Sequence, residues 1–299
     1  MPVGMAAEAS SLRSSECLRI LHLSDTHGMH RTLEHRFGPL PAADILVHTG
    51  DFTDAGTKRE FVEFDTWLSS LRSRYPHVLV VFGNHEYEGW LHDSACAAAE
   101  DAILWPDGQL QRRLLPNAEV LEHEQVTVRG IRFYGSPWCA WHRANAPGDA
   151  RAGPEGVHRF GDVPEGVDVL LSHGAPWGIF DRMETTQQHW GGSKALRRAI
   201  EQVRPTAHLF GHIHEQRGVW RKPPGADHFV GGVEYELVPG VARPTFPPPP
   251  PSYPCELVSC NAMANHPGME GTKRHLAGPA RLILATRRGP DQPWTFTPA

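Results

Sequence analysis

The sequence runs VLVVFGNHEYEGW from Val78 to Trp90, and this stretch indicates the class of fold. It begins with apolar residues and changes, at a glycine, to an amide, an imidazole and a carboxylate. A short β-branched run that stops at a glycine is typical of a strand buried on both faces, as in a sheet covered by helices. Ligand sites in such sheets lie beyond the carboxyl ends of the strands. Asn84, His85 and Glu86 therefore stand where a functional site is expected.

Similar runs occur on both sides of this stretch and alternate with helical patterns. One helix is predicted from an N-cap at Thr57 to about Arg74, and another from an N-cap at Ser193 to about Val203. The buried strands are predicted at Leu18–Ser24, Asp44–Thr49, Val78–Phe82, Val167–Leu171 and Ala207–Phe210. Strands that alternate with helices predict an α/β fold with a parallel sheet at its core.

The middle of the chain predicts a second sheet. The segment AEVLEHEQVTVRGIRFYGSPW has strand-like runs on either side of Arg129 and Gly130, which favours an antiparallel hairpin. Strand-like runs resume at Glu256–Ser259 and Arg281–Ala285. We therefore expect a single domain over residues 17–288, with a Pro/Gly-rich insertion at 221–254, a disordered N-terminus at 1–16 and a C-terminal tail at 289–299.

Composition limits the kinds of partner and the compartment. A formal net charge of −5 and a pI near 6.4 argue against an extended nucleic-acid surface, which needs a basic excess. The 5 cysteines have no Cys-x-x-Cys spacing, so a disulfide framework or a structural zinc site is not expected. The first residues lack the features of a secretory leader, and no window is apolar enough for a membrane span. These observations predict a soluble protein of the cytoplasm without a membrane partner.

Polar side chains follow each of the five predicted buried strands. The groups are Asp25-Thr26-His27, Gly50-Asp51, Gly83-Asn84-His85-Glu86, His173 and Gly211-His212-Ile213-His214. Carboxylates and imidazoles placed together suit divalent transition metals, and a carboxylate that bridges two ions permits a pair about 3.5–4 Å apart. Turn chemistry alone gives no reason for His and Asn at five separate strand ends, so the ordered set predicts a metal site.

At these residues the sequence resembles the calcineurin-like metallophosphoesterase superfamily, with its pattern D-x-H, GD, GNH-[DE], H and GHxH complete and in order. Further similarity in HLSDTHG, HTGDFT, FYGSPW and SHGAP resembles the metallophosphoesterase-domain-containing subgroup, which is similar to class III cyclic nucleotide phosphodiesterases. The resemblance covers Asp25 to His214. It implies two stacked mixed sheets flanked by helices, a four-layer sandwich with a dinuclear site at the shared edge of the sheets.

The resemblance also implies a role for each matched residue. It gives Asp25, His27 and His214 to one metal, gives Asn84, His173 and His212 to the other, and makes Asp51 the bridge. His85 is implied to be catalytic and not a ligand: it protonates or stabilises the leaving oxygen while a metal-bridging hydroxide attacks in line. Manganese, iron, zinc and cobalt all accept such mixed ligands.

These implications lead to an enzyme, a metal-dependent phosphoric ester hydrolase that acts on a small phosphodiester or monoester, with cyclic nucleotides favoured. Two alternatives stay open. One is a protein phosphatase on the same fold, and the other is a non-catalytic scaffold similar to the cargo-sorting retromer subunit. Retention of all the matched positions favours the enzyme over the scaffold.

Several further residues have a structural interpretation. His22, His48 and His208 lie within strands, where a packed or hydrogen-bonded role is expected, and His48 is the strongest candidate to support a ligand. Glu86 is expected to support its loop. Asp54 is expected either to orient a ligand or to cap the turn, and the cap is favoured. Trp138 and His142 are possible pocket residues, although an aromatic there is more often core. The run at 246–254, FPPPPPSYP, is interpreted first as a stiff spacer and second as a weak polyproline ligand.

Overall fold

The first sheet contains the motif-bearing strands of the N-terminal part of the chain. The computed structural model describes residues 15–88, 112–137, 163–181, 192–234, 247–265 and 274–299. Within them the first sheet has six strands in the order β13-β12-β1-β2-β3-β4. These are β1 Glu16–Leu23, β2 Ile45–His48, β3 His77–Val80, β4 Glu119–Val120, β12 Arg281–Arg287 and β13 Thr295–Pro298. Strands β1 to β4 are parallel, whereas β12 and β13 pair antiparallel.

The second sheet contains seven strands in the order β10-β9-β11-β8-β7-β6-β5. Their bounds are β5 Glu124–Val128, β6 Ile131–Ser136, β7 Val169–Ser172, β8 Ala207–Phe210, β9 Gly218–Arg221, β10 Val230–Val233 and β11 Leu257–Cys260. β6, β7, β8 and β11 are parallel neighbours, and β5, β9 and β10 pair antiparallel. Both sheets are therefore mixed, and the carboxyl ends of their central strands face one rim.

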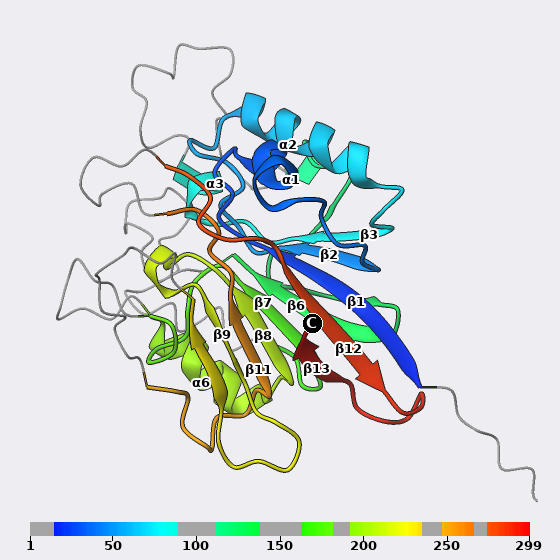
Figure 1. Ribbon diagram of the computed structural model, residues 1–299, viewed down its shortest axis with the longest axis vertical. Coiled ribbons are helices and arrows are strands. Elements are labelled where there is room, and N and C mark those ends of the chain that lie inside the picture. Colours follow the sequence, from blue (N-terminus) through cyan, green and yellow to red (C-terminus); the bar gives the residue numbers. More distant parts are fainter. Residues whose placement is uncertain (1–14, 89–111, 138–162, 182–191, 235–246, 266–273) are drawn as a thin grey trace, which may run out of the picture.

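Two longer helices cover the outer faces of the two sheets. α2, Lys58–Leu71, begins at a capping box in which Thr57 and Glu60 satisfy each other's backbone amides. α6, Lys194–Val203, begins at Ser193, whose side chain accepts from the amide of Leu196. Figure 1 shows α2 over the sheet with β2 and β3, and α6 against the other sheet. The shorter helices are η1 His30–Thr32, α1 Leu33–Phe37, α3 Asn84–Glu88 and η3 His214–Gln216.

Three hydrophobic clusters separate the layers. Ile20, Val47 and Leu79 point between the sheets and pack in a cluster with residues of the second sheet such as Val169 and Leu209. Their chain neighbours, such as Leu21 and Leu46, point the other way and pack with Phe61 and Phe64 of α2. A third cluster lies between the second sheet and α6. Because side chains alternate along a strand, burial on both faces requires the continuous apolar runs seen in the sequence.

This architecture confirms the predicted α/β fold with two mixed sheets flanked by helices. The predicted α6 and β8 match the observed elements in full, and the hairpin at Arg129 and Gly130 is present as β5 and β6. The domain bounds stay a prediction, but two segments contain more structure than expected. β10 lies inside the expected insertion at 221–254, and β13 lies inside the expected tail at 289–299.

β13 is ordered because Trp294 and Phe296 of this segment are buried in the cluster between the sheets. Pairing with β12 covers this apolar surface. In the proline run, Tyr253 is also buried, with the guanidinium of Arg197 over its ring at 4.6 Å. The tyrosine therefore contributes to the core, while Pro247, Pro248, Pro250 and Pro251 are exposed. Binding of a polyproline partner stays a prediction.

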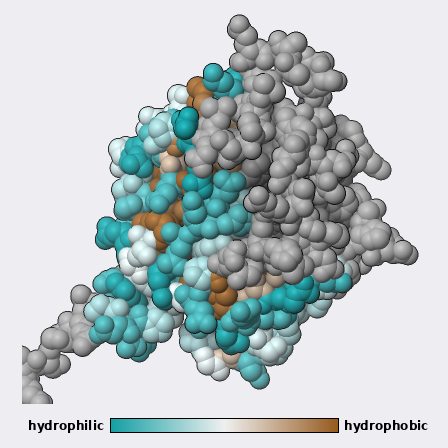
Figure 2. Space-filling view, turned by 180° about the vertical axis from the view of Figure 1, so that it is seen from behind, coloured by the Kyte–Doolittle hydropathy of each residue, from teal (hydrophilic) through white to brown (hydrophobic). Residues whose placement is uncertain are grey.

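The described surface has few large apolar side chains. Val62 is the exposed large hydrophobic residue of the described part, and Figure 2 shows a largely hydrophilic face with small separate apolar areas. No helix in the described ranges has the length and apolar character needed to cross a membrane.

Candidate metal centre

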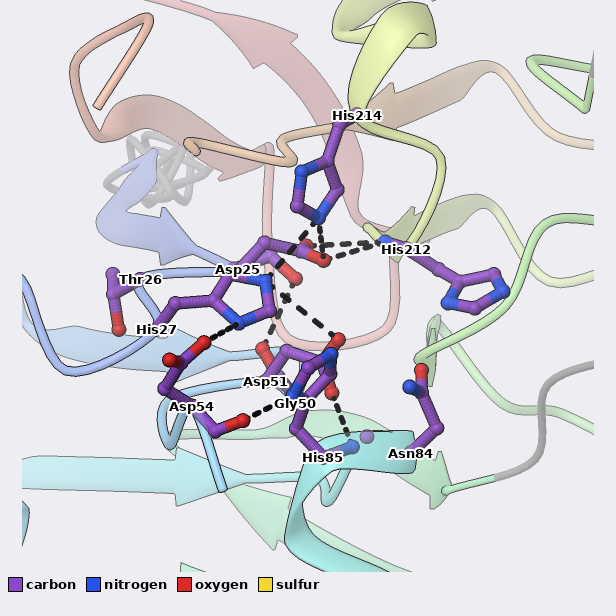
Figure 3. Close-up of polar contacts among 12 residues, drawn as sticks. Asp25, Thr26, His27, Gly50, Asp51, Asp54, Asn84, His85, His212 and His214 are labelled. Atoms are coloured by element: carbon purple, nitrogen blue, oxygen red, sulfur yellow. Dashed lines mark hydrogen bonds and ion pairs between the residues drawn. The ribbon is translucent and has the colours of Figure 1, made fainter. Parts of the chain in front are cut away.

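The polar groups after the strands of both sheets converge on one rim. Asp25, Asp51 and Asn84 follow β1, β2 and β3 of the first sheet, whereas His173 and His212 follow β7 and β8 of the second. His214 begins η3 just beyond. Figure 3 shows the side chains of Asp25, His27, Asp51, Asn84, His85, His212 and His214 in one group. The predicted set is thus brought together from distant segments, such as those of His27 and His214, which lie 187 residues apart in the chain.

Four residues of this group have a left-handed backbone. The φ angles are 54° at Asp25, 41° at His27, 54° at Asp51 and 70° at His212. Non-glycine residues rarely adopt positive φ, and each such residue costs on the order of 1–3 kcal/mol. Such backbone strain tends to occur at functional sites, where the surrounding structure enforces it.

Two glycines of the motifs allow the loops to approach closely. A Cβ at Gly83 would overlap Oδ1 of Asp51, and a Cβ at Gly211 would overlap Oδ2 of Asp25. Neither glycine has a positive φ, so the requirement is one of space and not of conformation. The GNH and GHxH motifs need glycine because a carboxylate of the neighbouring loop occupies the place of the side chain.

The first group of donors consists of Asp25, His27 and His214, whose ligand atoms lie within 4.8 Å of one another. Nε2 of His214 lies 3.2 Å from Oδ1 of Asp25 and 3.2 Å from Nε2 of His27. Asp25 and His27 are buried. The three groups therefore present an oxygen and two imidazole nitrogens toward a common point.

The second group consists of Asp51, His173 and His212, again with ligand atoms within 4.8 Å of one another. Nε2 of His173 lies 3.3 Å from Oδ2 of Asp51, 3.1 Å from Nδ1 of His212 and 3.0 Å from Oδ1 of Asn84. Nδ1 of His173 lies 2.9 Å from the carbonyl oxygen of Thr49 and donates to it. That hydrogen bond keeps a proton on Nδ1, so Nε2 is the atom that would serve as a ligand once a cation displaces its proton.

Asp51 and His85 connect the two groups. Oδ2 of Asp51 lies 3.9 Å from Nε2 of His27 as well as 3.3 Å from His173, so this carboxylate faces both sides. His27, Asp51 and His85 form a third group within the same distance limit. The ring of His85 meets that of His27 edge-on at 4.5 Å, and its Nδ1 lies 2.6 Å from the carbonyl oxygen of Asp54. His85 is partly exposed at the rim.

Carboxylates and imidazoles of the site lie beside one another and shift each other's pKa values. Burial by itself would raise the pKa of Asp25 and of Asp51, but the neighbouring His214 and His173 outweigh it and hold both values below the ordinary range. Burial would likewise lower the pKa of His173, yet the charge of Asp51 raises it to about 9. The hydrogen bond to Asp25 similarly raises the pKa of His214 despite its burial. The buried carboxylates thus require positive charge beside them.

The residues present fit divalent cations. Two carboxylates, several imidazole nitrogens and one amide oxygen converge, and the two adjacent nitrogens of His27 and His214 cannot both donate to each other. A hydrogen bond between these nitrogens uses one lone pair and one proton, whereas a cation between them would accept a lone pair from each ring. The donor set is therefore suited to divalent transition metals, and the carboxylate of Asp51 faces both groups of donors.

Glu86 supports the loops of the site, which confirms the sequence expectation. Its carboxylate is fully buried and accepts from the amides of Asp51, Thr53 and Gly83, at 2.8, 2.9 and 2.6 Å, and from the hydroxyl of Thr53 at 2.8 Å. Burial and the charge of Asp51 raise the pKa of Glu86 to about 7. This one side chain fixes the loop after β2 against the loop after β3.

Asp54 differs from the favoured of its two sequence expectations, the turn cap. Thr57 and Glu60 cap the following helix, and the amide of Asp54 itself donates to Glu60 at 2.8 Å. The carboxylate of Asp54 instead pairs with Arg274 and has Oδ1 3.7 Å from Nδ1 of His27. Arg274 also lies 3.0 Å from that same nitrogen. Sequence reasoning missed Arg274 because the surrounding residues GTKRHLAG contain no recognisable motif and lie far from the others in the chain.

Two other histidines have structural roles, as expected. His22 lies 3.0 Å from the hydroxyl of Thr49 and 3.3 Å from that of Ser259, and His208 lies 2.8 Å from the hydroxyl of Ser172. Both are fully buried in the sheets. Trp138 and His142 lie outside the described residues.

Comparisons with known proteins agree with the geometry. The family model described as calcineurin-like phosphoesterase matches residues 18–216. Metallophosphoesterase domain-containing protein 1 of Homo sapiens is 35% identical over 212 residues, which cover 67% of this chain and 62% of that protein. UPF0046 protein K07C11.7 of Caenorhabditis elegans is 31% identical over 205 residues, or 68% of this chain and 65% of that protein. The chain thus covers less than two thirds of the length of these relatives.

A solved structure, phosphopantetheinyl hydrolase from Mycobacterium tuberculosis, is 17% identical and covers 68% of this chain and 85% of its own, with a TM-score of 0.43.

Proposed function

Because the chain belongs to the calcineurin-like phosphoesterase family, we propose that it is a dinuclear metal-dependent phosphoesterase. The proposal depends most on one observation: the carboxylate of Asp51 lies between two groups of donors, with Oδ2 3.3 Å from His173 and 3.9 Å from His27. A carboxylate shared in this way is the feature that two-metal hydrolytic sites require.

We assign the ligands in two sets. Asp25, His27 and His214 would hold one ion, Asn84, His173 and His212 would hold the other, and Asp51 would bridge them. Divalent ions bound there would supply a hydroxide nucleophile at neutral pH and neutralise the charge on the phosphate oxygens. Manganese, iron, zinc and cobalt are all compatible with this mixed donor set.

His85 is assigned to the proton transfer that releases the leaving oxygen. Its ring lies at the rim of the site, and its Nδ1 donates to the carbonyl of Asp54 at 2.6 Å. That bond fixes the ring and directs Nε2 away from the carbonyl, so Nε2 is the atom available to protonate a leaving group. The backbone amide of His85 also donates to Oδ1 of Asp51 at 2.9 Å, which ties the ring to the bridging residue.

The proposed substrates are small phosphodiesters or monoesters, with cyclic nucleotides favoured. This preference comes from the likeness of HLSDTHG, HTGDFT and SHGAP to proteins that resemble class III cyclic nucleotide phosphodiesterases. The net charge of −5 supports a small substrate over an extended nucleic acid. Free thiols at the described Cys17, Cys255 and Cys260 support the cytoplasm as the proposed compartment.

A hydrolysis panel with added Mn²⁺ tests the proposal. The substrates are a nitrophenyl monoester, the corresponding bis-nitrophenyl diester, and 2′,3′- and 3′,5′-cyclic nucleotides. We expect turnover of the diesters that a chelator abolishes and that Asn84→Ala and His85→Ala each reduce by at least about a hundredfold. Stoichiometric metal uptake without hydrolysis of any substrate would instead support a scaffold, and unchanged turnover in both variants would remove the proposed mechanism.

A further inference from the structure

His48 connects two of the loops that carry candidate ligands. It is the last residue of β2 and is fully buried. Its Nε2 lies 3.1 Å from the hydroxyl oxygen of Thr26, and its Nδ1 lies 3.3 Å from the backbone nitrogen of Gly50. Thr26 stands between Asp25 and His27 in the chain, and Gly50 directly precedes Asp51.

The two hydrogen bonds determine the tautomer of the ring. A backbone amide can only donate, so Nδ1 of His48 must accept from Gly50. The proton of the neutral ring is therefore on Nε2, which donates to the hydroxyl of Thr26. Reversing the ring or protonating both nitrogens would remove the bond to Gly50. The arrangement has one direction, from the Gly50 amide through the imidazole to Thr26.

Packing holds the plane of the ring. Phe52 and Phe64 meet His48 edge-on, with ring centroids at 5.9 and 5.3 Å. The same two phenylalanines stack on each other at 4.1 Å, so the wall against His48 is itself fixed. Burying an imidazole beside these phenylalanines is costly unless its nitrogens form hydrogen bonds. The bonds of His48 to Thr26 and Gly50 meet this requirement, and they connect the ring to two loops of the site.

Both loops that His48 joins contain residues with a strained backbone. Asp25, His27 and Asp51 all have positive φ, at 54°, 41° and 54°. Backbone bonds also join the loops, from Asp25 to Gly50 at 2.8 Å and from His27 to Asp51 at 2.9 Å. Such a conformation persists only when several contacts enforce it. His48 adds side-chain contacts from the core side, while Figure 3 shows Thr26 apart from the converging side chains of Asp25 and Asp51.

We propose that His48 is a positioning residue that holds the Asp25–His27 segment against Asp51 at the separation that paired cations need. The inference rests on the proposed function, since it concerns the ligands assigned there. His48 contacts neither the substrate nor the ions. It acts through Thr26 and Gly50, and its effect should appear in cation affinity and ligand geometry before it appears in stability.

Four variants separate the polar contacts from the packing. His48→Asn places an amide oxygen near the Nδ1 position and keeps the bond from Gly50, whereas His48→Gln places an amide nitrogen near the Nε2 position and keeps the bond to Thr26. His48→Phe keeps the packing and removes both bonds. Thr26→Val removes the acceptor and leaves the histidine in place, so it remains informative if His48→Phe does not fold. Thr286→Val on β12 is the matched control.

The measurements are Co²⁺ affinity by titration of the full chain, the Co²⁺ absorption spectrum, and the midpoint of urea unfolding without metal. We expect Thr26→Val and His48→Asn each to weaken Co²⁺ binding about tenfold and to alter the spectrum. The double variant with Thr26→Val and His48→Asn should bind Co²⁺ no more weakly than either single variant, because both substitutions remove the same hydrogen bond. His48→Phe should be the weakest binder, His48→Gln should retain more affinity than His48→Phe, and Thr286→Val should match wild type.

Wild-type affinity and spectrum in a folded His48→Phe variant would overturn the positioning role, as would additive losses in the double variant. Losses of affinity that merely follow the loss of unfolding free energy would overturn it too, because a structural role predicts that correlation. A wild-type chain that takes up no cation would overturn the proposed function as well, and this outcome is distinct because it appears before any substitution is made.

Discussion

The backbone amide of His212 donates hydrogen bonds to both carboxylate oxygens of Asp25, at 3.1 and 3.0 Å. One residue follows a strand of the second sheet and the other follows a strand of the first. These bonds therefore join the two sheets at the rim where the candidate ligands gather. They hold the Asp25 carboxylate through the backbone of His212, so the imidazole of His212 is not used for this contact. Gly211 makes the approach possible, because a Cβ there would overlap Oδ2 of Asp25 and Oγ of Ser24.

Gly211→Ala should therefore weaken cation binding. The new methyl group would displace the Asp25 carboxylate, and we expect the affinity for Mn²⁺ to fall about 10–100-fold. Gly225→Ala is the control, since a Cβ at Gly225 meets no atom within 4 Å even though its φ is +76°. Equilibrium titration of both full-length variants checks this. Equal affinities in the two variants would show that the close approach at Gly211 does not set the position of Asp25.

Glu86→Gln should destabilise the fold. The carboxylate accepts from three backbone amides and one hydroxyl, and an amide side chain would turn an NH₂ group toward some of these donors. We expect the free energy of unfolding to fall by about 2–4 kcal/mol, since buried donors that lose a charged acceptor are costly. Urea unfolding measures the change. Glu63→Gln on the exposed side of α2 should change stability by about 0.5 kcal/mol or less, and a similar loss in both variants would refute the role of Glu86.

Most of the fold and of the candidate site could be predicted from the sequence, because both depend on local features. The runs that form β2, β3, β7 and β8 are apolar on both faces, and glycine with a polar group marks each end. Parallel strands bring their carboxyl ends to one edge of a sheet, so Asp51 and Asn84 meet at the edge of the first sheet and His173 and His212 at the edge of the second. Stacking of the two sheets then brings these edges together.

Other features could not be predicted because they depend on distant contacts. Arg274 reaches Asp54 and His27 from a segment with no motif, so only the folded chain shows it beside the site. Pairing of β13 likewise depends on burial of Trp294 and Phe296 between two sheets whose positions the sequence does not give. The interpretation of Asp54 as a turn cap was wrong for the same reason, because its partner Arg274 is remote in the chain.

Asn84 and His85 are neighbours in the chain, and we predict that only the substitution of Asn84 lowers the metal content. Oδ1 of Asn84 lies 3.0 Å from Nε2 of His173, among the donors of the second group. Asn84→Ala should therefore lose about one bound ion per chain, whereas His85→Ala should keep both and lose about 10²–10⁴-fold in kcat. Elemental analysis of purified protein, with turnover measured in parallel, checks this. Loss of an ion from His85→Ala would make His85 a ligand, as its place beside His27 and Asp51 also permits.

Asp181 provides a prediction for the pH dependence of stability away from the candidate ligands. Burial raises its pKa from 3.8 to about 6, although the amides of Gly178 and Gly192 and the charge of Arg197 act in the opposite direction. Because the folded-state pKa is raised, the contribution of Asp181 to stability is complete below pH 3.8 and is lost as the pH rises to about 6. Asp181→Asn cannot ionise, so between pH 4 and pH 8 it should gain up to about 3 kcal/mol of unfolding free energy relative to wild type. Urea unfolding in chelator at both pH values measures the gain, with exposed Asp291→Asn as control; a variant that follows the wild-type pH dependence would contradict it.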